Sequence, residues 1–301
     1  MGFDFPSLAE LRAIGRRYFG SRPQEASPQE APPSNVHLRD LLETPFQNIN
    51  DAHERLGELE TRLRGQSDRR SVFLTVYVRM THAVSEAIDA GHFSDENWIR
   101  NYTVTFADYY RRALLAFERG QSAPVPRAWQ IGFSVSLSGR TIILQDALLG
   151  INAHINYDLA YTVSDVGIDP DRPAKRRDHD AINAILRRLI DDTQRVLAEI
   201  YPNEAIAALD DLLGRGDEAI ALLALVGSRD LAWRNAVHLT DTSFPPIRSL
   251  VRWRIDSVAT GAAHVIAGFS ADNDATNRAR EVEAYSAPLN AFRDAFLSRV
   301  A

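Results

Sequence analysis

The order of hydrophobic and polar positions predicts helices along almost the whole chain from residue 37 onward. Asp95 precedes one apolar run as an N-cap, and Gly132 and Gly139 are expected breaks in another. No alternating strand pattern and no glycine-rich phosphate loop is present. We therefore expect an all-α fold, a single bundle of about eight to ten helices around a buried central helix. The predicted helices cover residues 46–65, 70–90, 94–118, 127–163, 176–201, 203–214, 217–240, 246–268 and 273–299.

The first part of the chain has a different pattern. Residues 7–19 are amphipathic and predict a short helix with Ser7 as its N-cap, and residues 20–35 contain four prolines, as is typical of a linker. We therefore divide the chain into an N-terminal helix with a proline-rich linker, residues 1–36, and a helical bundle domain, residues 37–301. We expect the N-terminal helix to dock on the body of the protein. Its basic face is also compatible with packing on a second subunit or with a membrane surface.

One apolar segment near the middle of the chain carries two narrow rows of polar side chains. On a helix with about 100° per residue, one row contains Gln145, Asn152 and Asn156. The other row lies on the opposite side and contains His154 and Asp158. Burying an unpaired amide costs roughly 2–7 kcal/mol and an unpaired charge costs more, so both rows need partners. This pattern predicts a buried central helix with a separate role for each side.

Gly150 interrupts the same segment. A glycine in the middle of a helix costs about 1 kcal/mol relative to alanine. We therefore expect a neighbouring helix or a ligand to approach the backbone closely at this position.

His154 and Asp158 are four residues apart, so a helix places them on one face. Such a pair binds a metal ion in helical metal sites, or its carboxylate orients the imidazole as a general base. The structural alternative is a buried hydrogen bond that fixes helix packing. The residues alone leave these three interpretations open.

A second group of candidates opens the next predicted helix. Asp178 and His179 lie near its start, and Asn183 follows His179 at the same four-residue spacing. In the functional interpretation these side chains complete a site with His154. The alternative is that the acidic residues cap the helix, where its dipole favours negative charge.

Arg229 and Trp233 are also four residues apart and share a helix face. In the functional interpretation they reach inward and contact a substrate. The structural alternative is a buried arginine paired with Asp158 or Asp178.

Composition removes several kinds of chemistry. The chain has no cysteine, which excludes disulfides, thiolate metal ligands and a cysteine nucleophile. Lys175 is the only lysine, which argues against a Schiff base. The net charge of −6 argues against a nucleic-acid partner. No apolar run reaches the roughly 18 residues of a transmembrane helix, and no secretory signal precedes the first helix. We expect a cytoplasmic protein.

Seven stretches of the chain carry a resemblance to a known family. They are Tyr77 to Val84, Phe93 to Trp98, Phe106 to Tyr109, Trp129, Gly150 to Leu159, Asp178 to Asn183 and Arg229 to Trp233. Together they resemble an uncharacterised all-helical family of bacterial and archaeal proteins, a domain of unknown function. Its most specific part here is the Gly-x-Asn-Ala-His-Ile-Asn-x-Asp-Leu segment. The resemblance covers roughly residues 45–240 and implies a helical fold and a shared site, without an activity.

Our leading hypothesis is an enzyme with a polar pocket inside the bundle, acting on a small, partly apolar molecule. A non-haem divalent metal fits the histidine and carboxylate donors, although the sequence does not specify a cofactor. The rival hypothesis is a non-catalytic helical scaffold or small-ligand-binding protein whose polar rows are packing networks. A homo-oligomer is left open. The predicted catalytic residues are His154, Asp158 and Asp178; the predicted substrate-binding residues are Gln145, Asn152, Asn156, Asn183, Arg229 and Trp233; the predicted metal ligands are His154, Asp158 and His179.

Overall fold

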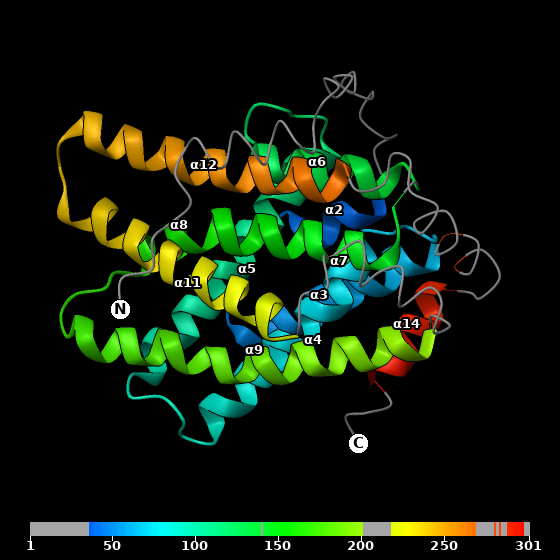
Figure 1. Ribbon diagram of the computed structural model, residues 1–301, viewed down its shortest axis with the longest axis horizontal. Coiled ribbons are helices and arrows are strands. Elements are labelled where there is room, and N and C mark those ends of the chain that lie inside the picture. Colours follow the sequence, from blue (N-terminus) through cyan, green and yellow to red (C-terminus); the bar gives the residue numbers. More distant parts are fainter. Residues whose placement is uncertain are drawn as a thin grey trace. The chain divides into compact units, whose positions relative to one another are not determined.

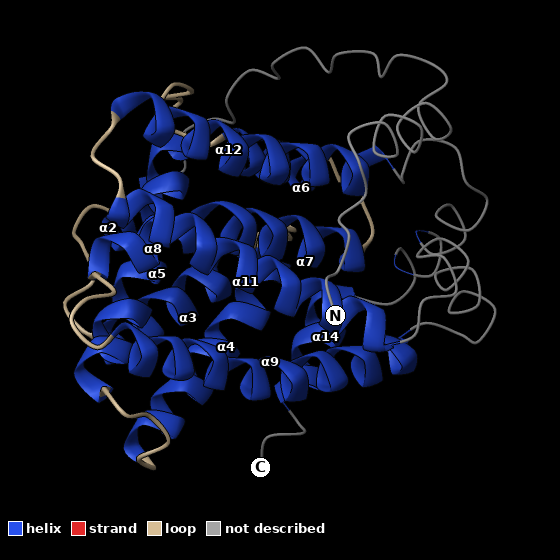
Figure 2. Cartoon of the chain, turned by 60° about the vertical axis from the view of Figure 1, so that its left-hand side comes forward, coloured by secondary structure: helices blue, strands red, loops and turns tan. Residues whose placement is uncertain are grey.

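The computed structural model describes residues 36–139, 141–200, 218–268, 280, 283 and 288–297. Within these residues every regular element is a helix and there is no strand (Figure 2). The described part holds ten helices when the continuous run Ile143–Val166 is counted as one. The predicted all-α bundle is therefore confirmed. The helices predicted at 7–19 and 203–214 and the linker at 20–35 lie outside the described residues.

The helices follow the predicted order along the chain. Their bounds are α2 (Val36–Leu42), α3 (Ile49–Gly65), α4 (Ser71–Asp89), α5 (Glu96–Glu118), α6 (Arg127–Leu137), α7 (Ile143–Asn152), the π-helical segment η1 (Ala153–Asp158), α8 (Leu159–Val166), α9 (Arg172–Ile200), α11 (Glu218–Asp241), α12 (Pro245–Gly268) and α14 (Pro288–Leu297).

Local sequence accounts for where several helices begin and end. Asn48 caps α3 by accepting from the amides of Asn50 and Asp51, so that this helix starts at Ile49, later than predicted. Asp95 caps α5 by accepting from the Trp98 amide at 2.9 Å, as predicted. The helix predicted at 127–163 is split after α6, where Gly139 has a φ of 64°. The other expected break, Gly132, lies inside α6 without interrupting it.

The run α7, η1 and α8 passes through the middle of the helices and forms the predicted central helix (Figure 1). α6 and α12 pack on one side of α7, and α4 packs on another. α8 packs against α5 and α11, while α9 and α14 pack against α4. The central helix is therefore covered by helices from both halves of the chain, which brings residues distant in sequence to its polar rows.

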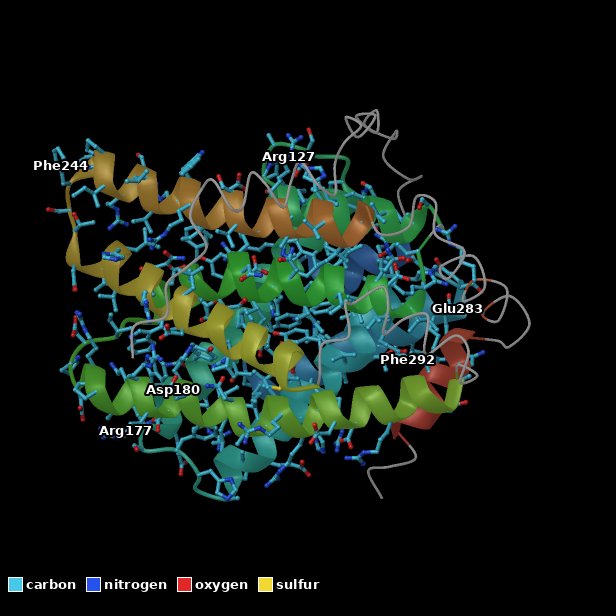
Figure 3. All side chains as sticks on the ribbon, viewed as in Figure 1. Arg127, Arg177, Asp180, Phe244, Glu283 and Phe292 are labelled. Carbon is cyan, nitrogen blue, oxygen red and sulfur yellow. The ribbon has the colours of Figure 1, made fainter. Side chains whose placement is uncertain are left out.

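α12 contributes its buried face to the bundle through small and branched residues. Val251, Ile255, Ala259 and Ala263 follow one another at four-residue spacing and are buried. Because Ala259 and Ala263 have short side chains, the backbone of α12 can approach the central helix. On its outer side α12 exposes large apolar residues, and Figure 3 shows Phe244 at the turn that joins it to α11. No helix in the described part of the chain is both long enough and apolar enough to cross a membrane.

Candidate functional site

The central helix changes its hydrogen-bonding pattern at η1. The Leu159 amide donates to the carbonyl oxygen of His154, five residues earlier, whereas an α-helix uses a spacing of four. Single turns of this kind are rare in helices and occur frequently at functional sites. His154 and Asp158 both belong to this segment. The two leading candidates from the sequence therefore lie in the turn that departs from α-helical geometry.

His154 and Asp158 form a buried hydrogen-bonded pair. Nδ1 of His154 lies 2.8 Å from Oδ2 of Asp158, and the indole Nε1 of Trp129 donates to the same oxygen from 2.9 Å. The exposed fraction is 2% for His154 and 0% for Asp158. Because an indole N–H can only donate, Oδ2 is the acceptor and holds both rings in place.

The environment keeps the imidazole uncharged. Burial lowers the pKa of His154, against the opposing effect of Asp158, and burial raises the pKa of Asp158. With its proton on Nδ1 facing Asp158, the neutral ring carries its free lone pair on Nε2. Neither Nε2 nor Oδ1 of Asp158 has a hydrogen-bond partner among the described residues. A neutral imidazole with a free acceptor nitrogen is the form that a general base requires.

Aromatic side chains from α4, α5 and α6 enclose the imidazole, and we call them the aromatic cage. The Phe106 ring is stacked on His154 with a centroid distance of 3.5 Å, and the Tyr77 ring meets it edge-on at 4.5 Å. The other members lie between 5.7 and 6.4 Å from it. The cage consists of Phe73, Tyr77, Phe106, Tyr110 and Trp129.

Two hydroxyl groups of the cage are buried without a partner. The hydroxyls of Tyr77 and Tyr110 make no hydrogen bond within the described part of the chain. Burial raises the pKa of both, and for Tyr77 the nearby Asp158 raises it further. Both groups therefore stay protonated and are available as donors. Buried polar atoms are normally paired, so unpaired atoms gathered around one imidazole need an explanation.

Gly150 makes room for the cage. A Cβ built on Gly150 would lie 2.3–2.6 Å from three atoms of Phe73. Only glycine therefore lets α4 bring the Phe73 ring over the central helix. The close approach expected at this position is confirmed, and the approaching group is a side chain of a neighbouring helix.

The other polar row faces α12. Nε2 of Gln145 donates to the Ile266 carbonyl oxygen, and Nδ2 of Asn152 donates to the Ala259 carbonyl oxygen, both at 2.9 Å. Nδ2 of Asn156 donates to Oδ1 of Asn152, also at 2.9 Å. The structure thus places Gln145 and Asn152, two of the residues predicted to bind a substrate, against the backbone of α12, and places Asn156, a third, beside Asn152. That predicted role is not tested by this geometry.

Asp146 anchors the start of the central helix. It accepts from Nε of Arg69 at 2.7 Å and from the hydroxyls of Ser136 and Thr141 at 2.8 and 2.5 Å. Burial raises the pKa of Asp146 to about 6, although these partners favour the charged form. The arrangement ties the turn before α4 and the helix α6 to the start of α7.

A second buried cluster surrounds His179. Nε2 of His179 lies 3.3 Å from the Arg229 carbonyl oxygen, and Nδ1 lies 3.3 Å from the Tyr102 hydroxyl. Burial, followed by the charges of Arg229 and Arg176, lowers the pKa of His179 well below its usual value. The neutral ring therefore donates from Nε2 and accepts from Tyr102 at Nδ1, so both of its nitrogens are occupied.

Arg229 belongs to this second cluster. Its Nε donates to Oδ1 of Asn183 at 2.8 Å, and its Nη2 donates to the His179 carbonyl oxygen at 2.6 Å. Nη1 lies 3.4 Å from the Tyr102 hydroxyl. The alternative prediction, a pair with Asp158 or Asp178, is wrong because the guanidinium is bound by neutral groups.

Asp178 and Trp233 border the same cluster. The carboxylate of Asp178 accepts from the backbone amides of Ser94 and Asp95 at 2.8 Å, immediately before α5. Its charge thus stabilises the start of a neighbouring helix. The Trp233 ring lies against His179 with a centroid distance of 5.2 Å. Neither residue contacts the His154–Asp158 pair through any hydrogen bond or ring contact found in the described part.

A cavity of about 30 Å³ between α4 and α5 adjoins both clusters. Tyr77 and Phe106 form its wall toward His154, and Tyr102 and Arg229 form its wall toward His179. A second cavity, of about 10 Å³, lies beside Phe73. A water molecule needs roughly 10–15 Å³, so the larger cavity has room for about two water-sized atoms.

The described residues contain no group of three or more His, Asp or Glu side chains arranged to hold a metal ion. The predicted ligands His154, Asp158 and His179 are thus divided between two clusters. A metal at this site stays a prediction.

Sequence reasoning missed three residues that complete the site. Tyr102, Phe106 and Tyr110 follow one another at four-residue spacing on α5, which places them on one face of that helix. The spacing is visible in the sequence. A row of aromatic residues at helical spacing is, however, typical of any hydrophobic core, so it did not indicate a site.

The comparisons agree with the resemblance found in the sequence. A model described as a family of unknown function, DUF5995, matches residues 49–268, close to the range of 45–240 that was expected. No curated protein and no solved structure matches the chain. The match includes the central helix, the aromatic cage and the His179 cluster. Because it spans more than two thirds of the sequence, the chain belongs to this family of unknown function, DUF5995.

Proposed function

We propose that the chain is an enzyme in which the His154–Asp158 pair acts as a general base on a small, partly apolar molecule. The observation that carries this proposal is the free Nε2 of a neutral, buried imidazole whose other nitrogen is held by a carboxylate. A carboxylate that orients a histidine in this way fixes the tautomer and stabilises the imidazolium formed when Nε2 takes a proton.

The chemistry that suits this pair is proton transfer. Nε2 can remove a proton from a carbon acid or from a water molecule, and Asp158 then faces a charged ring. No serine, threonine or cysteine hydrogen-bonds to the imidazole within the described residues, so no covalent nucleophile accompanies it. A divalent metal, a small-molecule partner and a cytoplasmic location stay predictions.

Access requires movement of the cage. His154 is enclosed, and the adjoining cavities of about 10 and 30 Å³ are too small for a substrate of more than a few heavy atoms. The Phe106 ring lies between the imidazole and the larger cavity, since it is stacked on the former and lines the latter. Displacement of Phe106 would join the cavity to His154 and create a pocket.

The reactivity of His154 tests this proposal without knowledge of the substrate. Diethyl pyrocarbonate acylates neutral imidazole nitrogens that it can reach, and peptide mapping by mass spectrometry locates the products. We expect His154 to react in the native protein more slowly than the exposed His82 but clearly faster than His179, whose nitrogens are both occupied. If His154 reacts no faster than His179, the pair is a closed packing network, and the scaffold hypothesis is favoured.

A direct assay follows from the same chemistry. Small carbonyl compounds are incubated with the protein in deuterated water, and proton exchange is followed by NMR. General-base catalysis typically contributes roughly 10²–10⁴-fold, so His154→Gln should remove exchange seen with the wild type. Asp158→Asn should lower the rate while leaving the fold intact, since Trp129 can still donate to the remaining oxygen.

A further inference from the structure

Arg229 is a buried cation without a counter-charge. It is 2% exposed, and the described residues place no carboxylate within ion-pair distance of its guanidinium. The acidic residues beside Arg229 and its partner His179 are bound elsewhere. Asp178 binds backbone amides, and Asp180 and Asp230 bind Arg176. Buried charges are normally paired with an opposite charge or with a ligand. The unbalanced charge of Arg229 therefore calls for an anion.

The guanidinium still has hydrogen-bond donors to offer. A guanidinium carries five N–H groups, and Arg229 uses one from each nitrogen, toward Asn183, the His179 carbonyl oxygen and the Tyr102 hydroxyl. Tyr102 donates its own proton to the neutral His179 and so orients the arginine. Arg229 lines the 30 Å³ cavity, and two of its N–H groups are not used by these three partners.

Tyr77 lines the same cavity and is a second possible donor. It is 6% exposed, lines the cavity, and its hydroxyl has no partner among the described residues. The neighbouring Thr81 hydroxyl donates to the Tyr77 carbonyl oxygen, and it also lies close enough to the Tyr77 hydroxyl to lower the pKa of that phenol. Tyr77 and an arginine without a counter-charge thus line one small space.

The dimensions of the space select the anion. A volume of about 30 Å³ has room for about two water-sized atoms, which matches the two oxygens of a carboxylate better than the four oxygens of phosphate. Most of the remaining lining surface is apolar, which suits a short hydrocarbon chain; it comes from Met80, Val84, Phe106 and Ile182, together with Thr81, Tyr102 and Thr103. A planar carboxylate also fits the fork of an arginine.

We propose that Arg229 and Tyr77 form a receptor for the carboxylate group of a small monocarboxylic acid. Binding at this receptor does not depend on catalysis. Recognition of a substrate through its carboxylate rests on the proposed function. An acid bound by Arg229 would direct its chain toward Phe106 and Tyr77, whose rings contact the His154 ring.

Thermal unfolding with acetate as the probe tests the receptor. Acetamide has the shape of acetate without its charge, and gluconate has the carboxylate with a chain too long for the cavity. At constant pH and ionic strength, we expect acetate to raise the unfolding midpoint of the wild-type protein in a saturable manner, and acetamide and gluconate not to do so.

Variants assign the effect to the cavity. Tyr77→Phe should weaken acetate binding roughly tenfold, the loss expected for one hydrogen bond to a charged group. Tyr110→Phe removes another unpaired buried hydroxyl that does not line this cavity, and it should bind acetate like the wild type. Arg229→Gln should abolish the saturable shift if it folds. If it does not fold, the comparison of Tyr77→Phe with Tyr110→Phe tests the receptor.

The outcomes separate this proposal from the proposed function. His154→Gln should bind acetate within about twofold of the wild type, since the imidazole lies behind the cavity wall. If acetate binds and His154 is unreactive, the receptor proposal is supported and the proposed general-base function is rejected. The receptor is overturned if acetate and acetamide act alike, or if Tyr77→Phe and Tyr110→Phe bind acetate equally well.

Discussion

On the side of the central helix that faces α12, every amide nitrogen of the polar row donates to an acceptor: Gln145 and Asn152 to carbonyl oxygens of α12, and Asn156 to Asn152. On the side that faces α4 and α5, His154 and Asp158 each keep an atom without a partner in the described structure. One helix thus carries a satisfied row and an unsatisfied row. The first contributes to stability, and the second retains polar atoms that stability alone would remove.

The difference has a physical origin in the neighbours. α12 approaches through Ala259 and Ala263, so its backbone carbonyl groups come within reach of side-chain amides. α4 and α5 approach through large aromatic rings, which surround the imidazole and offer few acceptors. Each row therefore meets a different kind of surface, and mutations on the two sides should have different consequences.

The largest loss of stability is expected where Phe73 of the aromatic cage contacts the central helix at Gly150. Gly150→Ala places a methyl group 2.3–2.6 Å from atoms of Phe73, so that the ring must move. We expect the free energy of unfolding to fall by about 3 kcal/mol, at the upper end of overpacking effects. Chemical denaturation measures the change.

A matched glycine provides the control for this variant. The Cβ of Gly132→Ala in α6 would meet Leu149 at an ordinary 3.8 Å. That variant should be neutral or more stable by about 0.5–1 kcal/mol, because alanine favours the helix. Equal destabilisation by the two variants would show that Phe73 does not require Gly150.

Removing hydrogen bonds from the row that faces α12 should lower the free energy of unfolding of the protein. Asn152→Ala leaves the Ala259 carbonyl oxygen and the Asn156 amide without partners, and we expect a loss of about 1–3 kcal/mol by chemical denaturation. Asn156→Ala removes only a half-buried donor and should cost less than 1 kcal/mol, at about the net worth of one hydrogen bond. If Asn152→Ala is neutral, the row facing α12 is not structural, and a role in binding a substrate gains support.

Sequence reasoning reached the two rows because they depend on local spacing. The four-residue intervals of His154 and Asp158, and the position of Gly150, are properties of one helix and do not require knowledge of its neighbours. η1 was not predicted, because a helical wheel assumes one uniform twist. The π-helical turn nevertheless keeps the two polar rows on separate sides of the central helix.

The partners of the second cluster depended on tertiary structure. The structural alternative for Arg229 is a carboxylate partner, because a buried charge normally has one, yet Asp178 accepts from the amides before α5. The pattern of residues within α9 or α11 cannot show that the Asp178 carboxylate binds the backbone at the start of another helix. The aromatic cage was not predicted as a unit for a related reason, since its members come from three helices and resemble ordinary core residues.

The two buried histidines offer a smaller, pH-dependent contrast. The pKa of His179 lies well below its usual value in the folded protein because of burial and the charges of Arg229 and Arg176, so the unfolded chain binds the proton more tightly. Its contribution to stability is present above a pH of about 6.5 and is lost as the pH falls below that value, by up to about 1.4 kcal/mol per pH unit. Burial also lowers the pKa of His154, but Asp158 opposes the shift.

Unfolding free energies measured between about pH 7 and 5 should therefore depend less steeply on pH in His179→Gln than in the wild-type protein. His154→Gln should reduce the slope less, because Asp158 already compensates part of the shift. Asp146 contributes in the opposite direction, since burial raises its pKa to about 6, but it is common to all three proteins and cancels in the comparison. A larger effect from His154→Gln would contradict the assignment of His179 as the more strongly shifted ring.

The smallest expected change is the most specific to the unsatisfied row. Removing a buried hydroxyl that has no partner removes the cost of desolvating it, so Tyr77→Phe and Tyr110→Phe should each leave the free energy of unfolding unchanged or raise it by up to about 1 kcal/mol. Tyr102→Phe is the matched control, because its hydroxyl lies between His179 and Arg229, and its loss should cost about 1 kcal/mol or more. Denaturation midpoints of the three variants, measured without added carboxylate, decide between the two rows. If Tyr77→Phe is as destabilising as Tyr102→Phe, the Tyr77 hydroxyl has a partner in solution that satisfies it, and the contrast between the two sides of the helix disappears at that residue.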